Sequence, residues 1–117
     1  MAANDIEKAW LFHEIGRCYL ELGHNEKACD YGNKSLDAAK AINDEIWQLN
    51  ATVLIAQSEA KIGDIDNMIS AIEHFEASLE MTKKQSKYIF NFSIITLKFH
   101  LCFNKMMLLP KMLLLKH

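Results

Sequence analysis

Hydrophobic side chains recur every three or four residues through the first 84 positions, in four blocks separated by short polar interruptions. This spacing places the apolar positions on one face of an α-helix. In the first block these positions are Ala9, Phe12, Ile15, Gly16, Tyr19 and Leu22. We therefore expect four amphipathic helices joined by short turns.

The interruptions read GHN, INDE and GDID. Gly23 predicts the end of the first helix, because glycine adopts the left-handed conformation at little cost. Asn25 is the expected N-cap of the second helix, and Asn43 or Asp44 that of the third. The connections are short enough to make successive helices antiparallel neighbours.

The chain repeats itself at an offset of about forty residues. Gly23 aligns with Gly63, and beyond that glycine the offset grows until Ala28 aligns with Ala71. We expect the three extra residues to lie in the second unit's turn, where an insertion is tolerated. Each unit thus reads as helix, turn and helix.

Small residues within the helices predict close packing. A glycine inside a helix costs about 1 kcal/mol relative to alanine and so needs a packing reason. Gly16 and Ala28 are expected to mark the closest approach within the first hairpin, and Gly32 and Ser35 to admit the next hairpin.

The pattern F-x-x-I-G-x-x-Y-x-x-L-G-x-x-x-x-A, from Phe12 to Ala28, resembles a tetratricopeptide repeat. The second unit is a weaker match, with Thr52, Ala56 and Glu59 replacing the aromatic residue, the glycine and the tyrosine. The resemblance implies an all-α fold of antiparallel helical hairpins, a fragment of an α-solenoid. It implies two such hairpins in residues 1–84.

A narrower resemblance rests on the stretch WQLNATVLIAQ at 47–57. It is similar to repeats of the tetratricopeptide subunit of the outer dynein arm docking complex of motile cilia. That resemblance implies a non-catalytic scaffold in the cytoplasm and ciliary axoneme that helps to dock outer dynein arms onto microtubules. Its partners would be coiled-coil docking subunits and dynein-arm components. The alternatives are a general adaptor in signalling or spindle orientation, and a membrane-associated protein.

Tetratricopeptide proteins bind peptides mainly on the inner face of each unit's first helix. Carried over by position, this resemblance implies partner contacts at Trp10, Arg17, Glu21, Asn50, Gln57 and Lys61. Trp10 beside Arg17 suits an interface hot spot, although Trp10 could instead cover the start of its helix. The Lys and Asn clamp of chaperone-binding members is replaced by His13, Arg17 and Leu54, which argues against binding chaperone tails.

Charge divides the chain into two regions. Residues 1–80 hold all 15 acidic residues and six basic ones, a net charge of −9, whereas residues 81–117 hold seven lysines and no acidic residue. A charge of −9 would repel phosphate, so we do not expect the first region to bind nucleic acid. The acidic side chains are expected to form a solvated face or a patch for a basic partner.

The sequence contains no P-loop, GxSxG, HExxH or dinucleotide fingerprint, so we expect no enzyme activity and no cofactor. Three cysteines without a CxxC pair argue against zinc or a disulfide framework, and Cys18 and Cys29 are expected in the core. His74 with Glu73 or Glu76 is expected on a solvated helix face rather than in a metal site.

Residues 85–117 form a basic segment that is apolar nearly all round and lacks a tetratricopeptide signature. Three interpretations stay open: a capping helix, a poorly ordered tail, and a membrane-surface segment. Pro110 should end or kink any helix there. Against the docking-complex family, this departure suggests a truncated or spliced form with an unrelated end. The partner and the oligomeric state are not encoded in any motif we find.

Overall fold

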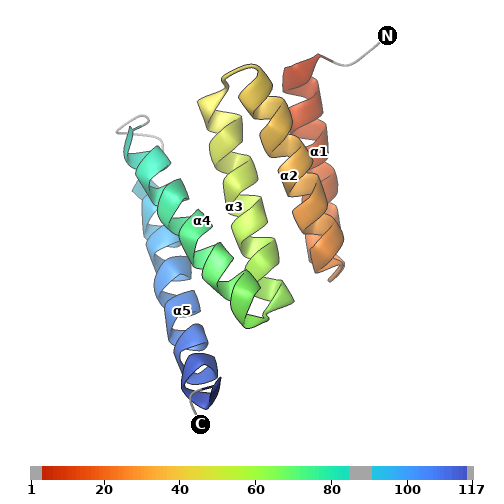
Figure 1. Cartoon of the computed structure of the whole chain (residues 1–117). Helices are drawn as coiled ribbons and strands as arrows, with labels where there is room; N and C mark the ends of the chain where they lie inside the picture. The colour runs from red at the N-terminus through yellow and green to blue at the C-terminus, as the bar shows by residue number, and fades with distance from the viewer. Residues whose placement is uncertain (1–3, 85–90, 116–117) are drawn as a thin grey trace.

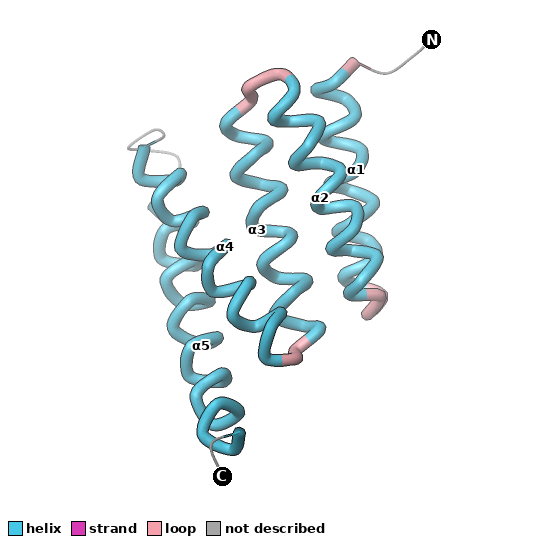
Figure 2. Tube along the Cα trace, viewed as in Figure 1, coloured by secondary structure: helices cyan, strands magenta, loops and turns pink. Residues whose placement is uncertain are grey.

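The computed structural model describes residues 4–84 and 91–115, with side chains from 96 to 114 in the second range. These residues form antiparallel helices without strands (Figures 1 and 2). The helices are α1 (Asp5–Glu21), α2 (Asn25–Ala41), α3 (Glu45–Ile62), α4 (Ile65–Lys84) and α5 (Asn91–Leu115). Each packs against the next, and α1 also packs against α3. The prediction of an all-α fold built from helical hairpins is confirmed.

Among the described residues, three in the left-handed conformation, spaced twenty apart, make the turns between α1 and α4. Gly23 and Gly63 have φ of +83°, and Asn43 has φ of +54°. After Asn43, Asp44 caps the N-terminus of α3: its carboxylate accepts a hydrogen bond of 2.9 Å from the Trp47 N–H. Asn25 is not the cap of α2: it is the helix's first residue, and His24 occupies the N-cap without a side-chain hydrogen bond.

Glycines bring α3 close to the first hairpin. A Cβ atom on Gly16 would lie 2.7 Å from Leu54 Cδ2 and 3.3 Å from the Ala28 carbonyl oxygen, and one on Gly32 would lie 2.8 Å from Ile55 Cγ1. These contacts agree with the expected roles of Gly16 and Gly32. Ser35 instead donates a hydrogen bond of 2.7 Å to the Ala9 carbonyl of α1, inside its own hairpin.

The two hairpins bury equivalent positions at the longer offset. The buried residues Ala28, Gly32, Ser35 and Ala39 of α2 correspond to Ala71, Phe75, Ser78 and Thr82 of α4, always 43 positions later. The expectation that the three inserted residues lie in the turn is wrong, because α4 begins at Ile65, forty positions after Asn25. They extend the start of α4 by almost one helical turn.

Helix α5 packs along α4. Buried Leu97 joins the core around Ala56 and Phe75, and buried Leu108 packs on Met68 and Ile72 near the start of α4. The ring of Phe75 stacks on that of His100, with centroids 5.4 Å apart. Ile65, in the extra turn of α4, packs on the same cluster, so this turn contributes to the surface that holds α5.

Pro110 neither ends α5 nor stops its last turn, because the helix continues to Leu115. The proline removes the hydrogen bond that would reach the carbonyl of Met106. Met106 is exposed, so water can hydrate that carbonyl.

Two positions expected on buried faces are exposed, Cys18 and Leu22. Cys18 lies two residues after buried Gly16, which turns it about 200° around the helix and away from the core. Leu22 follows the last residue of α1 as its C-cap and projects into solvent. Cys29 is half-buried.

Candidate functional site

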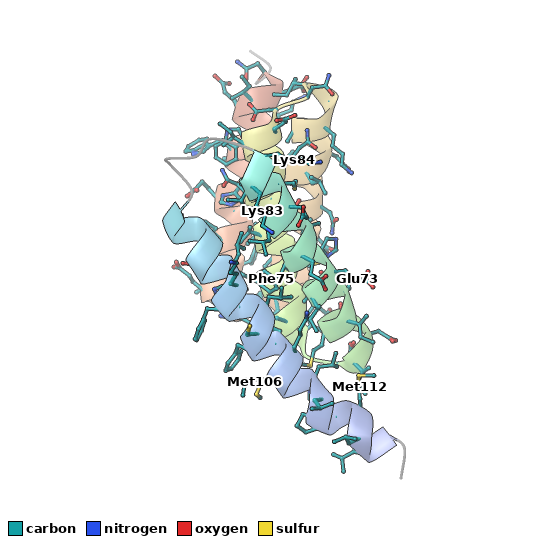
Figure 3. All side chains as sticks on the ribbon, turned by 90° about the vertical axis from the view of Figure 1, so that its left-hand side faces the viewer. Glu73, Phe75, Lys83, Lys84, Met106 and Met112 are labelled. Atoms are coloured by element: carbon teal, nitrogen blue, oxygen red, sulfur yellow. The ribbon has the colours of Figure 1, made fainter. Side chains whose placement is uncertain are left out.

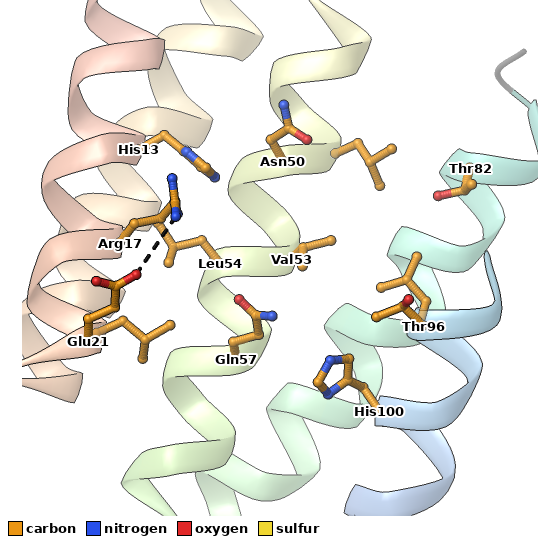
Figure 4. A pocket seen from close by; sticks show the side chains of 13 residues that line it. His13, Arg17, Glu21, Asn50, Val53, Leu54, Gln57, Thr82, Thr96 and His100 are labelled. Carbon is orange, nitrogen blue, oxygen red and sulfur yellow. Dashed lines mark ion pairs between the residues drawn. The ribbon is translucent and has the colours of Figure 1, made fainter. Parts of the chain in front are cut away.

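A groove of about 440 Å³ lies between α1 and α5, with α3 as its floor (Figure 4). The α1 side carries His13, Arg17, Leu20 and Glu21, and the floor carries Leu49, Asn50, Val53, Leu54 and Gln57. The α5 side carries Thr96, Leu97 and His100, with Thr82 of α4 beside them. Five apolar side chains lie among eight polar ones in this lining, so the groove can bury apolar groups of a ligand and hydrogen-bond its polar groups.

Four of the six expected contact residues meet in this groove: Arg17 and Glu21 on its wall, and Asn50 and Gln57 on its floor. Asn50 lies three residues before Val53 and Gln57 lies four residues after it, so all three share one face of α3. Trp10 and Lys61 lie outside the groove. Trp10 is 51% exposed on α1, and Lys61 lines a separate shallow pocket beside the turn at His24.

Arg17 is the positively charged group of the groove wall. Its guanidinium lies 3.3 Å from a Glu14 carboxylate oxygen and 3.8 Å from Glu21, and half of the Arg17 side chain is exposed. These exposed ion pairs contribute little to stability. The guanidinium can therefore be redirected to a carboxylate or a backbone carbonyl of a ligand at small cost.

His13 carries an unsatisfied nitrogen at the groove. Its Nδ1 is buried without a hydrogen-bond partner among the described residues, and it lies 3.5 Å from Glu14 Oε1. The ring packs edge-on against Trp47, with centroids 5.4 Å apart. Burial lowers the pKa of His13 below its usual value, against a smaller opposing effect of Glu14.

The residues of α4 and α5 that line the groove were not predicted from the sequence. Thr82, Thr96 and His100 carry no motif, and they reach the groove only because α5 packs on α4. His13 and Val53 are inner-face positions that the tetratricopeptide resemblance does give, because they share helix faces with the expected contact residues. No sequence signal announced that residues after 90 would complete the site.

A second polar cluster lies between α3 and α4, and it corrects the expectation for His74. His74 does not lie on a simply solvated face: its Nδ1 is 2.6 Å from Oε1 of Glu59, which is 7% exposed. The Ser70 hydroxyl donates to Glu59 Oε2 at 2.5 Å. The Ser70 hydroxyl also lies 3.5 Å from His74 Nδ1, so Glu59 holds both polar side chains of α4.

Over the described residues 4–84 and 91–115, no group of three or more His, Cys, Asp and Glu side chains could hold a metal ion. In the same residues, no helix is both long enough and apolar enough to cross a membrane.

The chain is similar to outer dynein arm-docking complex subunit 4 from several vertebrates. It is 55% identical to the Danio rerio protein over 83 residues, which are 71% of this chain and 16% of that relative. It is 49% identical to the Homo sapiens and Mus musculus proteins over 83 residues, 12% and 13% of those relatives. Over the matched segment, this chain is a homologue of these subunits.

The likeness has a defined extent. The chain spans about one sixth or less of the length of the relatives it matches. No family model matches the chain. No solved structure matches it.

Proposed function

We propose that this chain is a non-catalytic scaffold that helps to dock outer dynein arms onto the microtubules of the ciliary axoneme. The similarity to outer dynein arm-docking complex subunit 4 over 83 residues carries this proposal. Its partners would be the coiled-coil subunits of the docking complex and components of the dynein arm. The groove between α1 and α5 supplies a surface on which such a partner can lie.

The chemistry of the groove suits a peptide with apolar side chains. Val53 and Leu54 give an apolar floor, while the amides of Asn50 and Gln57 can donate to and accept from a ligand backbone. At the wall, Arg17 disfavours a cationic ligand side chain beside it, and Glu21 disfavours an anionic one. Coiled-coil segments, which alternate apolar and charged positions, offer this combination.

Affinity capture with the full-length chain as bait, in an extract of ciliated cells, tests the proposal. Docking-complex and dynein-arm subunits should be enriched and identified by mass spectrometry. Replacing Asn50 and Gln57 by alanine should lower that enrichment on the order of tenfold, since two interfacial hydrogen bonds are lost. Asn33→Ala is the matched control, because Asn33 is an exposed amide on α2. Both variants should keep the wild-type helicity.

The outcomes separate the role from the surface. If docking subunits are still enriched after the double substitution, the groove is not the binding surface, while the docking role stands. Retention of signalling or spindle proteins alone would show a general adaptor instead. An empty bait, with its fold intact, would contradict the scaffold role for this chain.

A further inference from the structure

The outward face of α5 is apolar and uncovered. Among the described side chains of this helix, seven large hydrophobic ones are at least 48% exposed, with Met106 at 73% and Leu114 at 76%. Figure 3 shows Met106 pointing away from α4. The face is formed mainly by Phe99, Phe103, Met106, Met107, Leu109 and Leu113. Contiguous apolar surface of this kind marks an interaction site.

Lysines border this face. Lys98 and Lys105 are exposed and seven residues apart, so they lie on the same side of the helix, at the edge of the apolar stripe. Lys111 lies on the other edge, where its ammonium donates to the Gly63 carbonyl. Residues 81–117 contain no acidic side chain. A partner that covers this face therefore contacts apolar side chains and positively charged ones together.

We propose that the outward face of α5 binds the surface of a bilayer containing anionic lipids. An apolar helix face with flanking lysines can lie in the plane of the interface, with its Phe, Leu and Met side chains at the acyl boundary and its ammonium groups at the phosphates. In this contact the helix lies in the plane of the membrane surface.

The position of α5 in the array allows this contact. The helix lies at the end remote from α1 and α2 (Figure 1). All acidic residues precede residue 81, and Glu73 of α4 projects away from α5 (Figure 3). The negatively charged body can therefore stay clear of the lipid phosphates while α5 approaches them.

A second copy of the chain fits this face less well than anionic lipid. In a two-fold pair, the same surface meets itself. With antiparallel α5 helices, the edges that carry Lys98 and Lys105 would fall on the same side of the interface, next to each other's positive charge. Anionic headgroups satisfy both the apolar stripe and the lysines.

Sedimentation of the full-length chain with vesicles tests the proposal. The chain should bind phosphatidylcholine vesicles that contain phosphatidylserine, bind phosphatidylcholine alone much less, and be released in part by added salt. The charge reversals Lys98→Glu and Lys105→Glu together should lower the partition coefficient by at least about 25-fold, since each lysine near an anionic surface contributes about fivefold.

The apolar part of the contact has its own variants. Phe99→Ser with Phe103→Ser should lower binding by on the order of tenfold or more, because both rings are exposed and would be buried only by the bilayer. Leu22→Ser is the matched control: Leu22 is 71% exposed but lies at the turn between α1 and α2. Its binding should equal that of the wild type.

Several results would overturn the proposal. These are equal binding to both kinds of vesicle, unchanged binding of either double variant, or no binding of a folded wild-type chain. A second copy of the chain would be the occupant instead if three results came together. The chain would not bind vesicles, it would sediment as a dimer without lipid, and the Phe99 and Phe103 substitutions would abolish that dimer.

Discussion

The Glu59 carboxylate and the His74 imidazole join α3 to α4 across a distance of 2.6 Å. Glu59 is buried and also accepts the Ser70 hydroxyl, while about a third of the His74 side chain is exposed. The hydrogen bond to Glu59 raises the pKa of His74 above its usual value, and this outweighs the opposing effect of burial. The pair makes the stability of the second hairpin depend on pH.

Stability should fall as the pH rises through the folded-state pKa of His74. Because that pKa is raised above 6.5, the folded state holds the proton more tightly than the unfolded state. The contribution is complete below pH 6.5 and is lost as the pH rises through the folded-state pKa. Urea unfolding of wild type and His74→Gln across this range should show a difference that shrinks at high pH. A difference independent of pH would contradict the linkage.

His13 should act in the opposite direction. Burial lowers its pKa, so its contribution is present above pH 6.5 and is lost as the pH falls through the folded value. The comparison with His74→Gln cancels this effect, because both proteins keep His13. A His13→Gln variant should, by contrast, lose stability less than the wild type on acidification.

Gly32→Ala should destabilise the fold by about 1–3 kcal/mol through overpacking, less a gain of up to about 1 kcal/mol in helix propensity. The new methyl group would lie 2.8 Å from Ile55 Cγ1, and Ile55 is 1% exposed. Urea denaturation measures the change. In an Ile55→Ala background the clash is absent, so the same substitution should be neutral or favourable. Equal costs in both backgrounds would show that this contact is not the cause.

Asp44→Ala should cost about 1 kcal/mol, because the carboxylate caps α3 by accepting the Trp47 N–H. Asn25→Ala is the contrasting substitution. The Asn25 Oδ1 is buried without a hydrogen-bond partner in the described residues, so its removal should be neutral or slightly stabilising. Thermal unfolding of the two variants compares them directly. A larger loss for Asn25 would restore it as a cap.

Leu108→Ala should loosen α5 without unfolding the rest of the array. Leu108 is 7% exposed and packs on Met68 and Ile72, so its truncation should cost about 2 kcal/mol or more. Hydrogen exchange should show faster amides in α5, with those of α1 to α3 unchanged. Leu109→Ala is the neighbouring control, since Leu109 is 58% exposed. Similar exchange in both variants would mean that Leu108 does not hold the helix.

Local chemistry allowed much of the fold to be predicted from the sequence. The end of α1 next to Gly23 was predictable because glycine adopts the left-handed conformation at little cost. The close approach of α3 to Gly32 was predictable because glycine has no side chain. Asn43 was read only as a cap, although asparagine also tolerates the left-handed conformation that it adopts here. The spacing of twenty residues between left-handed positions was the missing signal.

The candidate site was harder to predict. Arg17 and Asn50 follow from the resemblance, but Thr82 and His100 depend on how α5 packs, which no local pattern encodes. The pairing of Glu59 with His74 spans fifteen residues and two helices. Buried partners of this kind are decided by tertiary geometry, so a single sequence shows two ordinary polar residues.

The exposure of Cys18 and Cys102 makes the chain suited to site-specific labelling without added thiols. The two lie on α1 and α5, at opposite ends of the array (Figure 1). Burial raises the pKa of the half-buried Cys29, aided by the charges of Glu59 and Asp30. Since the thiolate is the reactive form, maleimide should modify Cys29 last at neutral pH. A donor and acceptor on the other two thiols would report directly on any flexing of the helical array, and an environment-sensitive dye on Cys102 would report on whatever covers α5.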